Sequence, residues 1–350
     1  MRAKNRKTYV SRSNMINREL VVEPSPHVTG GVTKDLLMKY TFVALCVIAA
    51  TAILAFGITA LFMEITAVVV AVISDYLLSL IMKKKGPINT YSAAVSGLIV
   101  ALSFSSGIPY SVQYSVPTME PNIQYIAVAV ISAVTVILFK RIQGLLGRKY
   151  VNPVAAAKLL VLAPIWSMAL MPQDHSIIDI SSFASLQVAL QACYSYNAPF
   201  KDPLLTLTVL KNHGWVGGAS SIAVIVVGTA LLLVSRGYLK LRIPLTFLAT
   251  TAIISASYGF INGEDIILRV AFHLFVGSVI FLAFFMAIDP ATTPLTGLGQ
   301  IIFAIGLGIL TFALQIWGHF FGGSILALVI MNLTVPLLDR VGIHKPFGRR

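Results

Sequence analysis

Long apolar stretches alternate with short polar segments along the chain after residue 39. An α-helix rises about 1.5 Å per residue, so about 20 apolar residues cross the ~30 Å hydrocarbon layer of a membrane. Ten stretches have the length and composition of such spans, at residues 40–63, 65–82, 90–107, 122–139, 152–171, 216–235, 243–261, 266–288, 297–316 and 321–338. The third and fifth contain Gly, Ser or Pro and are the least regular. The pattern predicts an all-α integral membrane protein with about ten transmembrane helices.

The composition narrows the class of protein. Of 350 residues, 57% are hydrophobic and only 11% are charged, less than half of the roughly 25% charged residues of an ordinary globular chain. This excludes a soluble enzyme. The two cysteines, Cys46 and Cys193, are too few for a disulfide framework or for an iron–sulfur cluster held within one chain. The sequence also lacks a phosphate-binding loop, a dinucleotide-binding glycine motif and a paired-histidine metal motif.

The basic residues predict how the chain is oriented. Lys and Arg outnumber Asp and Glu by 26 to 13, which gives a net charge of +13. Of these 26, 22 lie in segments that ten helices with both termini on one side would place on that same side. Because basic loops stay in the cytoplasm, we expect a multi-pass protein of the cell membrane with both termini cytoplasmic. A nucleic-acid-binding function would rest on the net charge alone and is disfavoured.

The ten helices divide into two sets of five. The passage Gly97–Pro109 in the third helix is similar to Gly277–Pro290 in the eighth. Because each half holds an odd number of helices, the halves would be inverted repeats, with a site near the midplane where interrupted helices face each other. The predicted organisation is a cytoplasmic basic tail at 1–39, a five-helix repeat at 40–171, an external loop at 172–215, a second five-helix repeat at 216–338 and a cytoplasmic C-terminus at 339–350.

Ionisable residues inside the predicted spans are candidates for function. A charge at the centre of a membrane helix costs about 2.5–3.5 kcal/mol on insertion scales and so calls for a partner or a role. Asp75 lies in the second span and Lys158 in the fifth. These two side chains either neutralise each other across the bundle or take part in ion passage. We place Glu64 in the hairpin between the first two spans, and we expect Arg269 to extend to the outer surface.

Several passages resemble the motifs of one membrane family. They are Phe284–Pro294 (FFMAIDPATTP), Tyr91–Leu98 (YSAAVSGL), Val151–Ala155 (VNPVA), Arg242–Leu245 (RIPL) and Gly214–Ser221 (GWVGGASS). The first is similar to F-F-M-A-T-D-P-x-T-[ST]-P, and the last to G-x-[IV]-G-E-x-S with Gly218 in place of the glutamate. The family comprises the D subunit of the Rnf electron-transport complex and the B subunit of the sodium-pumping NADH:quinone reductase. The resemblance extends over about residues 35 to 342.

The resemblance implies flavin chemistry. Relatives of this kind carry FMN, attached through its phosphate to a threonine hydroxyl in an external-loop motif D-G-x-[ST]-[GS]-A-T-P-L. The matching stretch begins at Asp179, and the acceptor position falls on Ser185, which offers the same hydroxyl group. Ile180 and Phe183 replace small residues of the motif, and the following proline is missing. The two alternatives are a phosphoester at Ser185 and an ordinary polar loop in which FMN is weakly bound or absent.

Two further positions follow from the resemblance, and a third is an ionisable residue at the inner end of the eighth span. Relatives imply riboflavin at the repeat interface, for which Asn152 and Asn332 are candidate hydrogen-bond partners; the alternative is that asparagines near helix ends act as caps. Asp289 directly precedes Pro290, and its carboxylate either caps the loop that follows or contacts a flavin or a cation.

The function implied by the resemblance is that of a membrane subunit of an Rnf-type ion-translocating oxidoreductase. Such a subunit would carry electrons across the membrane by flavin and couple them to Na+ or H+ movement. Its partners would be the other Rnf subunits (A, B, C, E and G), which supply the iron–sulfur clusters and a second flavin. The competing hypothesis is a secondary transporter or channel, for which a five-plus-five inverted repeat is equally natural.

Overall fold

The computed structural model describes ten segments of the chain: residues 33–82, 90–104, 121–142, 149–162, 205, 208–210, 215–235, 238–275, 279–316 and 323–342. The secondary-structure elements of these residues are helices. The first half contains α1 (Lys34–Phe56), α2 (Ile58–Ile81), α3 (Thr90–Leu102), α4 (Pro121–Val134), the π-helix η1 (Thr135–Ile142) and α6 (Pro153–Leu162). The second contains η4 (Val216–Gly218), α10 (Ser221–Val234), α11 (Arg242–Asn262), α12 (Ile266–Phe275), α13 (Val279–Phe281), the π-helix η5 (Leu282–Met286), α14 (Gly297–Ile316) and α15 (Gly323–Leu338).

The helices confirm an all-α, multi-pass membrane protein. Among the described residues, five helices are long and apolar enough to cross a membrane: Asp35–Phe56, Ile58–Ile81, Gln124–Arg141, Arg242–Asn262 and Gly297–Ile316. A sixth span is a bent pair, in which α12 and the α13–η5 segment meet at 61°. Each of the ten predicted stretches overlaps a helix or this pair, and five or six of them contain helices of spanning length among the described residues. The third and fifth stretches, expected to be the least regular, contain the short helices α3 and α6 of 13 and 10 residues.

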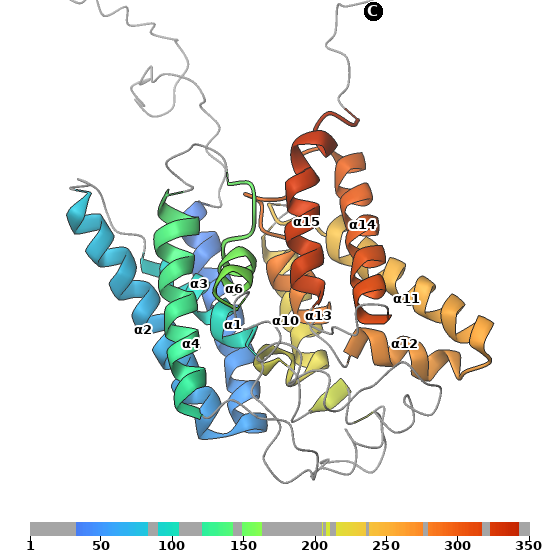
Figure 1. The fold of residues 1–350 in the computed structure, drawn as a ribbon, viewed down its shortest axis with the longest axis horizontal. Helices are drawn as coiled ribbons and strands as arrows, with labels where there is room; N and C mark the ends of the chain where they lie inside the picture. Colours follow the sequence, from blue (N-terminus) through green and yellow to red (C-terminus); the bar gives the residue numbers. More distant parts are fainter. Residues whose placement is uncertain are drawn as a thin grey trace, which may run out of the picture.

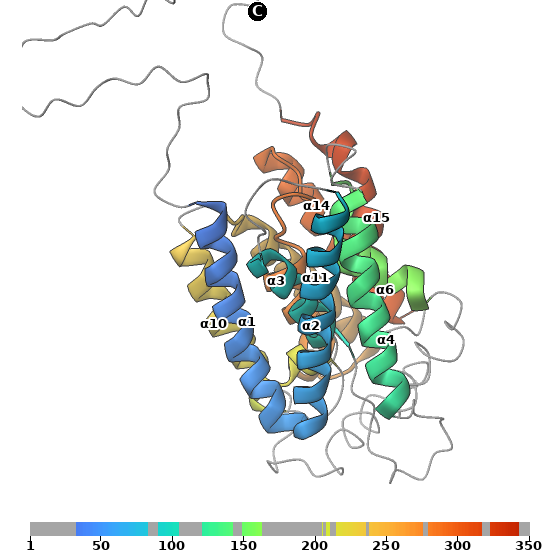
Figure 2. The same cartoon turned by 90° about the vertical axis from the view of Figure 1, so that its left-hand side faces the viewer.

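Figure 1 shows the two halves of the chain side by side. Helices α2 and α4 lie at one side and α11, α12 and α14 at the other, with α6, α10 and α13 between them. Helix α1 packs against both α3 and α10 and so joins the halves, which Figure 2 shows from the side. The α1–α2 turn lies at the lower end of Figure 1 and the α11–α12 turn at its right-hand edge, whereas η1 and α15 finish at the upper end.

The turn between α1 and α2 corrects one prediction. The chain turns at Gly57, whose φ of 71° favours glycine, and the Gly57 N–H donates to the Ile53 carbonyl at 2.8 Å. Glu64 therefore does not lie in the hairpin. It occupies the second turn of α2, where it is 5% exposed. The long apolar sequence on both sides of Glu64 made the polar residue look like the break, but the glycine conformation decides the position of the turn.

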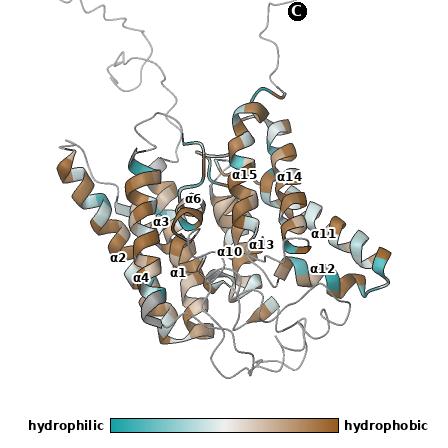
Figure 3. Cartoon of the chain, in the orientation of Figure 1, coloured by the Kyte–Doolittle hydropathy of each residue, from teal (hydrophilic) through white to brown (hydrophobic). Residues whose placement is uncertain are grey.

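Helix α2 presents apolar residues outwards and polar residues inwards. Its exposed side chains include Ile65, Ile73 and Leu77, whereas Glu64 and Asp75 are buried. Figure 3 shows this apolar character along α2 and α4, whose ribbons are mostly hydrophobic. A helix with its hydrophobic face outwards suits a lipid environment, in which polar side chains turn towards the protein interior.

The buried face of α2 packs closely on α3. A Cβ atom added to Gly97 of α3 would lie 2.6 Å from the Ala67 carbonyl oxygen and 2.8 Å from the Ala71 Cβ atom. Small residues on both helices thus bring the two backbones together, as is common between membrane helices.

Candidate functional site

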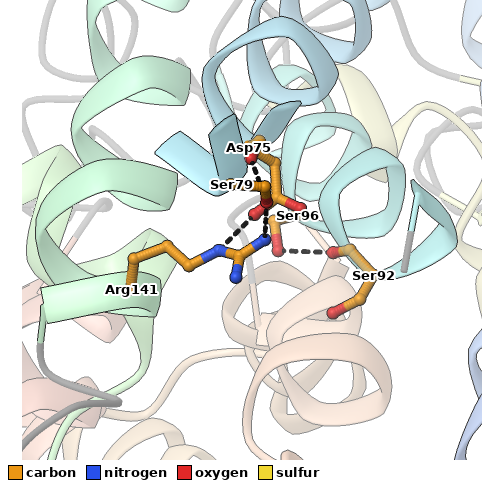
Figure 4. A network of polar contacts seen from close by, with 5 residues as sticks. All are labelled: Asp75, Ser79, Ser92, Ser96 and Arg141. Atoms are coloured by element: carbon orange, nitrogen blue, oxygen red, sulfur yellow. Dashed lines mark hydrogen bonds and ion pairs between the residues drawn. The ribbon is translucent and has the colours of Figure 1, made fainter. Parts of the chain in front are cut away.

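An ion pair joins α2 to η1 near the upper end of the bundle. Arg141 Nε lies 2.7 Å from Asp75 Oδ1, and Arg141 Nη2 donates to Ser79 Oγ at 2.9 Å (Figure 4). Ser79 Oγ in turn donates to the Asp75 carbonyl oxygen at 2.7 Å. The Asp75 side chain is 3% exposed and that of Arg141 is 18% exposed. The guanidinium therefore neutralises a carboxylate that the protein otherwise shields from solvent.

This geometry contradicts the predicted neutralisation of Asp75 by Lys158. The sequence pattern places Arg141 in a basic cytoplasmic loop, but the helix continues as η1, a π-helix, through Ile142. π-Helical segments are rare and occur often at functional sites. One feature of the sequence could have indicated that Arg141 belongs to the helix: it lies within about one helical turn of the end of the apolar stretch.

Lys158 lies instead at a junction between the two halves of the chain. Its Nζ donates to the Ser103 carbonyl at the end of α3. The same ammonium lies 4.4 Å from the centroid of the Trp215 ring, a favourable cation–π distance. Beside it, the Val216 N–H donates to the Phe104 carbonyl at 2.9 Å. A buried positive charge therefore lies where the end of α3 meets η4.

Asn152 joins the fifth and eighth predicted spans. Its Oδ1 accepts hydrogen bonds from the N–H groups of Val154 at 3.1 Å and Ala155 at 3.2 Å, which caps α6. Its Nδ2 donates to the Met286 carbonyl, the last of η5, at 3.0 Å. The VNPVA and FFMAIDP passages are thus in direct contact. Of the two alternatives for Asn152, a helix cap and a flavin contact, these bonds correspond to the cap. The oxygen and the nitrogen of its amide both bond the protein.

The Asp289 carboxylate organises the loop that follows η5. Asp289 Oδ1 accepts from the Ala291 N–H at 3.1 Å, and the Asp289 carbonyl accepts from the Thr292 N–H at 3.2 Å and from Thr293 Oγ1 at 3.0 Å. These contacts correspond to the capping alternative. The loop conformation is therefore built largely from its own side chains.

A second set of contacts holds the same loop to neighbouring helices. Lys240 Nζ donates to Thr293 Oγ1 at 2.8 Å and to the Pro294 carbonyl at 2.6 Å. Asp339, just beyond α15, accepts the Leu295 N–H at 2.8 Å through Oδ1. Lys240 lies two residues before the RIPL passage, so the segment that leads into this passage is bonded to the end of the FFMAIDPATTP passage. Sequence reasoning missed Lys240 because it counted this residue only as an orientation signal.

The remaining predicted site residues divide into two groups. Asn332 is fully buried in α15, which packs against α6, so both asparagine-bearing helices are neighbours. Ser185 and Asp179 lie outside the described residues. Among the described residues, no group of three or more His, Cys, Asp or Glu side chains is arranged to hold a metal ion.

Arg269 does not extend to the surface as predicted. It is 2% exposed, its Nε lies 3.2 Å from Glu264 Oε2, and its guanidinium lies 4.8 Å from the centroid of the Tyr258 ring. The Glu264 carboxylate and the Tyr258 ring thus stabilise the guanidinium inside the α11–α12 hairpin, in place of solvent.

One buried polar contact was not singled out from the sequence. His273 Nδ1 lies 2.8 Å from Gln315 Oε1, and both residues are fully buried between α12 and α14. The imidazole also packs on Phe312, with ring centroids 4.8 Å apart. A histidine in an apolar helix and a glutamine near the end of another carry no spacing signal that would pair them.

Comparison with known proteins gives relatives along nearly the whole chain. The D subunit of the Na(+)-translocating ferredoxin:NAD(+) oxidoreductase complex of Acetobacterium woodii is 29% identical over 334 residues, which is 94% of this chain and 95% of the relative. The D subunit of the proton-translocating ferredoxin:NAD(+) oxidoreductase complex of Clostridium ljungdahlii is 27% identical over 344 residues, 94% and 96% of the two chains. The D subunit of the ion-translocating oxidoreductase complex of Methanosarcina acetivorans is 27% identical over 332 residues, 93% and 96%.

The match to a family model is equally extensive. The model of the NQR2, RnfD, RnfE family matches residues 21–348, which include every helix described above. Two of the passages that carried the resemblance, Val151–Ala155 and Phe284–Pro294, are in direct contact through Asn152 and Met286, and Lys240, just before the third, Arg242–Leu245, bonds Pro294. The chain belongs to the NQR2, RnfD, RnfE family.

Proposed function

We propose that this chain is the D-type membrane subunit of an ion-translocating oxidoreductase complex, in which electron transfer drives Na+ or H+ across the cell membrane. The observation that carries the proposal is the similarity to D subunits over 94% of the chain, with 95% of the relative covered as well. Relatives of equal coverage are named for Na+ in one case and for protons in another. The similarity therefore supports the role of a D-type subunit and is compatible with transport of Na+ and with transport of H+.

Charges inside the bundle support a role in cation movement. Asp75 and Arg141 form an ion pair within helices that meet the length for membrane spans. Lys158 adds a buried positive charge at the C-terminal end of α3, against Trp215. Ionisable groups at membrane depth are costly and commonly mark ion pathways. We propose that Asp75 and Lys158 belong to the electrostatic boundary of such a pathway.

The distribution of basic residues supports an orientation. Lys140 and Arg141 at the end of η1, Arg242 at the start of α11 and Arg340 beyond α15 belong to the upper end of Figure 1. We propose that this end faces the cytoplasm, which puts both termini in the cytoplasm and the 172–215 segment outside.

The proposed electron carrier is FMN, joined through a phosphoester to the Ser185 hydroxyl. When bound, the isoalloxazine supplies the one-electron and two-electron chemistry that amino-acid side chains lack. The protein's part is to hold the flavin on the external side, with Asp179 at the start of the attachment stretch. For riboflavin at the repeat interface we propose Asn152 and Asn332 as the contacting residues; the Asn152 amide also bonds α6 and the Met286 carbonyl.

The cysteine content supports a multi-subunit arrangement. Two cysteines cannot ligate an iron–sulfur cluster within the chain. Electrons from a ferredoxin-type donor would therefore reach this subunit through clusters and flavins of the other subunits of the complex. We propose the A, B, C, E and G subunits of an Rnf complex as these partners.

Mass spectrometry tests the flavin assignment. The complex is purified after expression with its flavin-attaching enzyme, and the peptide containing Ser185 is analysed for an FMN adduct. We expect the adduct in the wild type and in Ser181→Ala, a matched control at the unrestricted position of the motif, and its loss in Ser185→Ala. In-gel fluorescence that survives denaturation should follow the same pattern. An unmodified Ser185 peptide from a fully assembled complex would contradict the attachment site.

A transport measurement separates the redox subunit from a secondary transporter. In proteoliposomes, a redox pump moves cations only while an electron donor and acceptor are supplied. Cation exchange by this chain alone, driven by an imposed gradient with no electron flow, would favour the transporter hypothesis.

A further inference from the structure

The buried face of α2 carries a carboxyl group that the sequence pattern places in a surface hairpin. Glu64 is 5% exposed, and its Oε1 atom has no hydrogen-bond partner in the part of the chain that the structure describes. Its helix, Ile58–Ile81, is one of those long and apolar enough to cross a membrane. Glu64 lies seven residues from Gly57, so it is about 10 Å into the helix from the lower end.

Asp75 provides the contrast within the same helix. The two residues are 11 positions apart, which is about three helical turns, so their side chains leave α2 on the same face. Asp75 has Arg141 Nε at 2.7 Å, whereas the described residues include no ion pair for Glu64. One carboxylate of this face is thus neutralised by a guanidinium and the other is not.

The helices that pack on α2 offer Glu64 no countercharge. Helices α3 (Thr90–Leu102) and α4 (Pro121–Val134) contain no charged residue. The charged residues of α1 lie within its first six positions, at the far end of that helix from Gly57. On α1 the titratable group within electrostatic reach of the Glu64 carboxyl is the Cys46 thiol, which is not a cation. Arg141 and Lys140 belong to η1, at the upper end.

An isolated carboxylate is strongly disfavoured in such surroundings. Removing an ionised carboxyl from water without a partner is so costly that the group takes up a proton instead. A sodium ion would satisfy the charge only with several further oxygen ligands. Beyond the Gly97 contact, however, α3 continues towards the lower end with buried apolar residues, among them Val100 and Ala101. The surroundings therefore suit a neutral carboxylic acid better than a carboxylate with a bound metal ion.

We propose that Glu64 is a proton-carrying residue of this subunit, holding a proton as a neutral acid in the lower half of the membrane span. The assignment rests on the proposed function, because the proton it holds is taken to be one that the complex moves. In each cycle the acid releases its proton and the carboxylate takes up another, so the group returns to its starting form with no net chemical change. The Asp75–Arg141 pair lies on the upper side of the same helix face and bounds the site there.

Infrared difference spectroscopy of the purified complex tests the protonation directly. A neutral carboxylic acid gives a C=O stretching band that shifts in D2O. A carboxylate lacks this band. We expect this band in the wild type at neutral pH, its loss in Glu64→Gln and its retention in Asp75→Asn, the matched control on the same helix face. Addition of Na+ should leave the band unchanged. A wild type without the band, or a band that disappears on addition of Na+, would overturn the proton assignment.

Proton pumping by the reconstituted complex supplies the functional arm. Glu64→Gln should lower redox-driven proton uptake into proteoliposomes at least tenfold, and Glu64→Asp should restore part of it. Because glutamine has nearly the size of glutamate and no charge, the complex should assemble normally, which its subunit composition checks. Unchanged pumping in Glu64→Gln would overturn the assignment alone. A wild-type complex that transfers electrons and moves no cation would overturn the proposed function, and the assignment with it.

Discussion

The ion pair between Asp75 and Arg141 gives an asymmetric prediction for stability. The Asp75 side chain is 3% exposed and that of Arg141 is 18% exposed. Removing the guanidinium with Arg141→Met leaves a buried carboxylate uncompensated, which costs about 3–5 kcal/mol of unfolding free energy. Removing the carboxylate with Asp75→Asn leaves a guanidinium that can still reach water at the upper end. We expect a smaller loss there, about 1–2 kcal/mol.

The double variant isolates the interaction itself. Asp75→Asn with Arg141→Met removes both charges, so the uncompensated carboxylate no longer contributes to the cost. The double variant should therefore lose less stability than Arg141→Met alone, with a coupling energy of about 2 kcal/mol or more between the sites. Arg141→Lys is the matched control, because an ammonium keeps the charge but not the geometry that joins Asp75 Oδ1 at 2.7 Å and Ser79 Oγ at 2.9 Å.

The assay is reversible unfolding in mixed detergent micelles, followed by helical circular dichroism, on all four forms of the cycle and on the lysine control. The order of stability should be wild type, then Asp75→Asn, then Arg141→Met. Equal losses in the two single variants, or a coupling energy below about 0.5 kcal/mol, would refute the reasoning from differential burial.

Three further changes test other contacts of the bundle. Gly97→Ala inserts a Cβ atom 2.6 Å from the Ala67 carbonyl oxygen, so it should destabilise the α2–α3 contact by about 1–3 kcal/mol in the same unfolding assay. Asn152→Ala removes the α6 cap and leaves the Met286 carbonyl without this donor, so the unfolding free energy should fall by about 2 kcal/mol. Asn152→Asp is the control, because it retains the capping oxygen. Lys240→Met removes the bonds to the loop after η5, so the unfolding free energy should fall by about 1–2 kcal/mol. Limited proteolysis should also cut that loop faster. Protection equal to that of the wild type would mean that the loop is held without Lys240.

The sequence predicted the fold well where a single physical constraint acts. The thickness of the membrane sets the length of an apolar run, so each predicted span overlaps a helix or a bent helix pair. The predicted start of α2 was wrong because polarity pointed to Glu64, whereas the left-handed conformation of Gly57 decides the turn. Hydropathy does not contain that information.

The candidate site was less predictable because it depends on distances between helices. Asp75 and Asn152 are recognisable as unusual, but their partners Arg141 and Met286 are remote in sequence and share no common spacing with them. Arg141 reads as a loop residue, since the continuation of α4 into a π-helix is not visible in composition. Positions of polar residues in spans could be predicted, but the partner that each one meets could not.

The central claim is that this chain couples electron transfer to cation movement as part of a multi-subunit membrane complex. The most direct measurement is cation uptake by proteoliposomes that contain the purified complex, during electron flow from reduced ferredoxin to NAD+, the donor and acceptor in the names of two relatives, with a pH-sensitive dye and radioactive Na+ as parallel readouts. We predict that cation accumulates inside only while electrons flow, and that a complex assembled without this subunit accumulates none. Electron transfer at full rate with no movement of either cation, or equal accumulation without this subunit, would contradict the account.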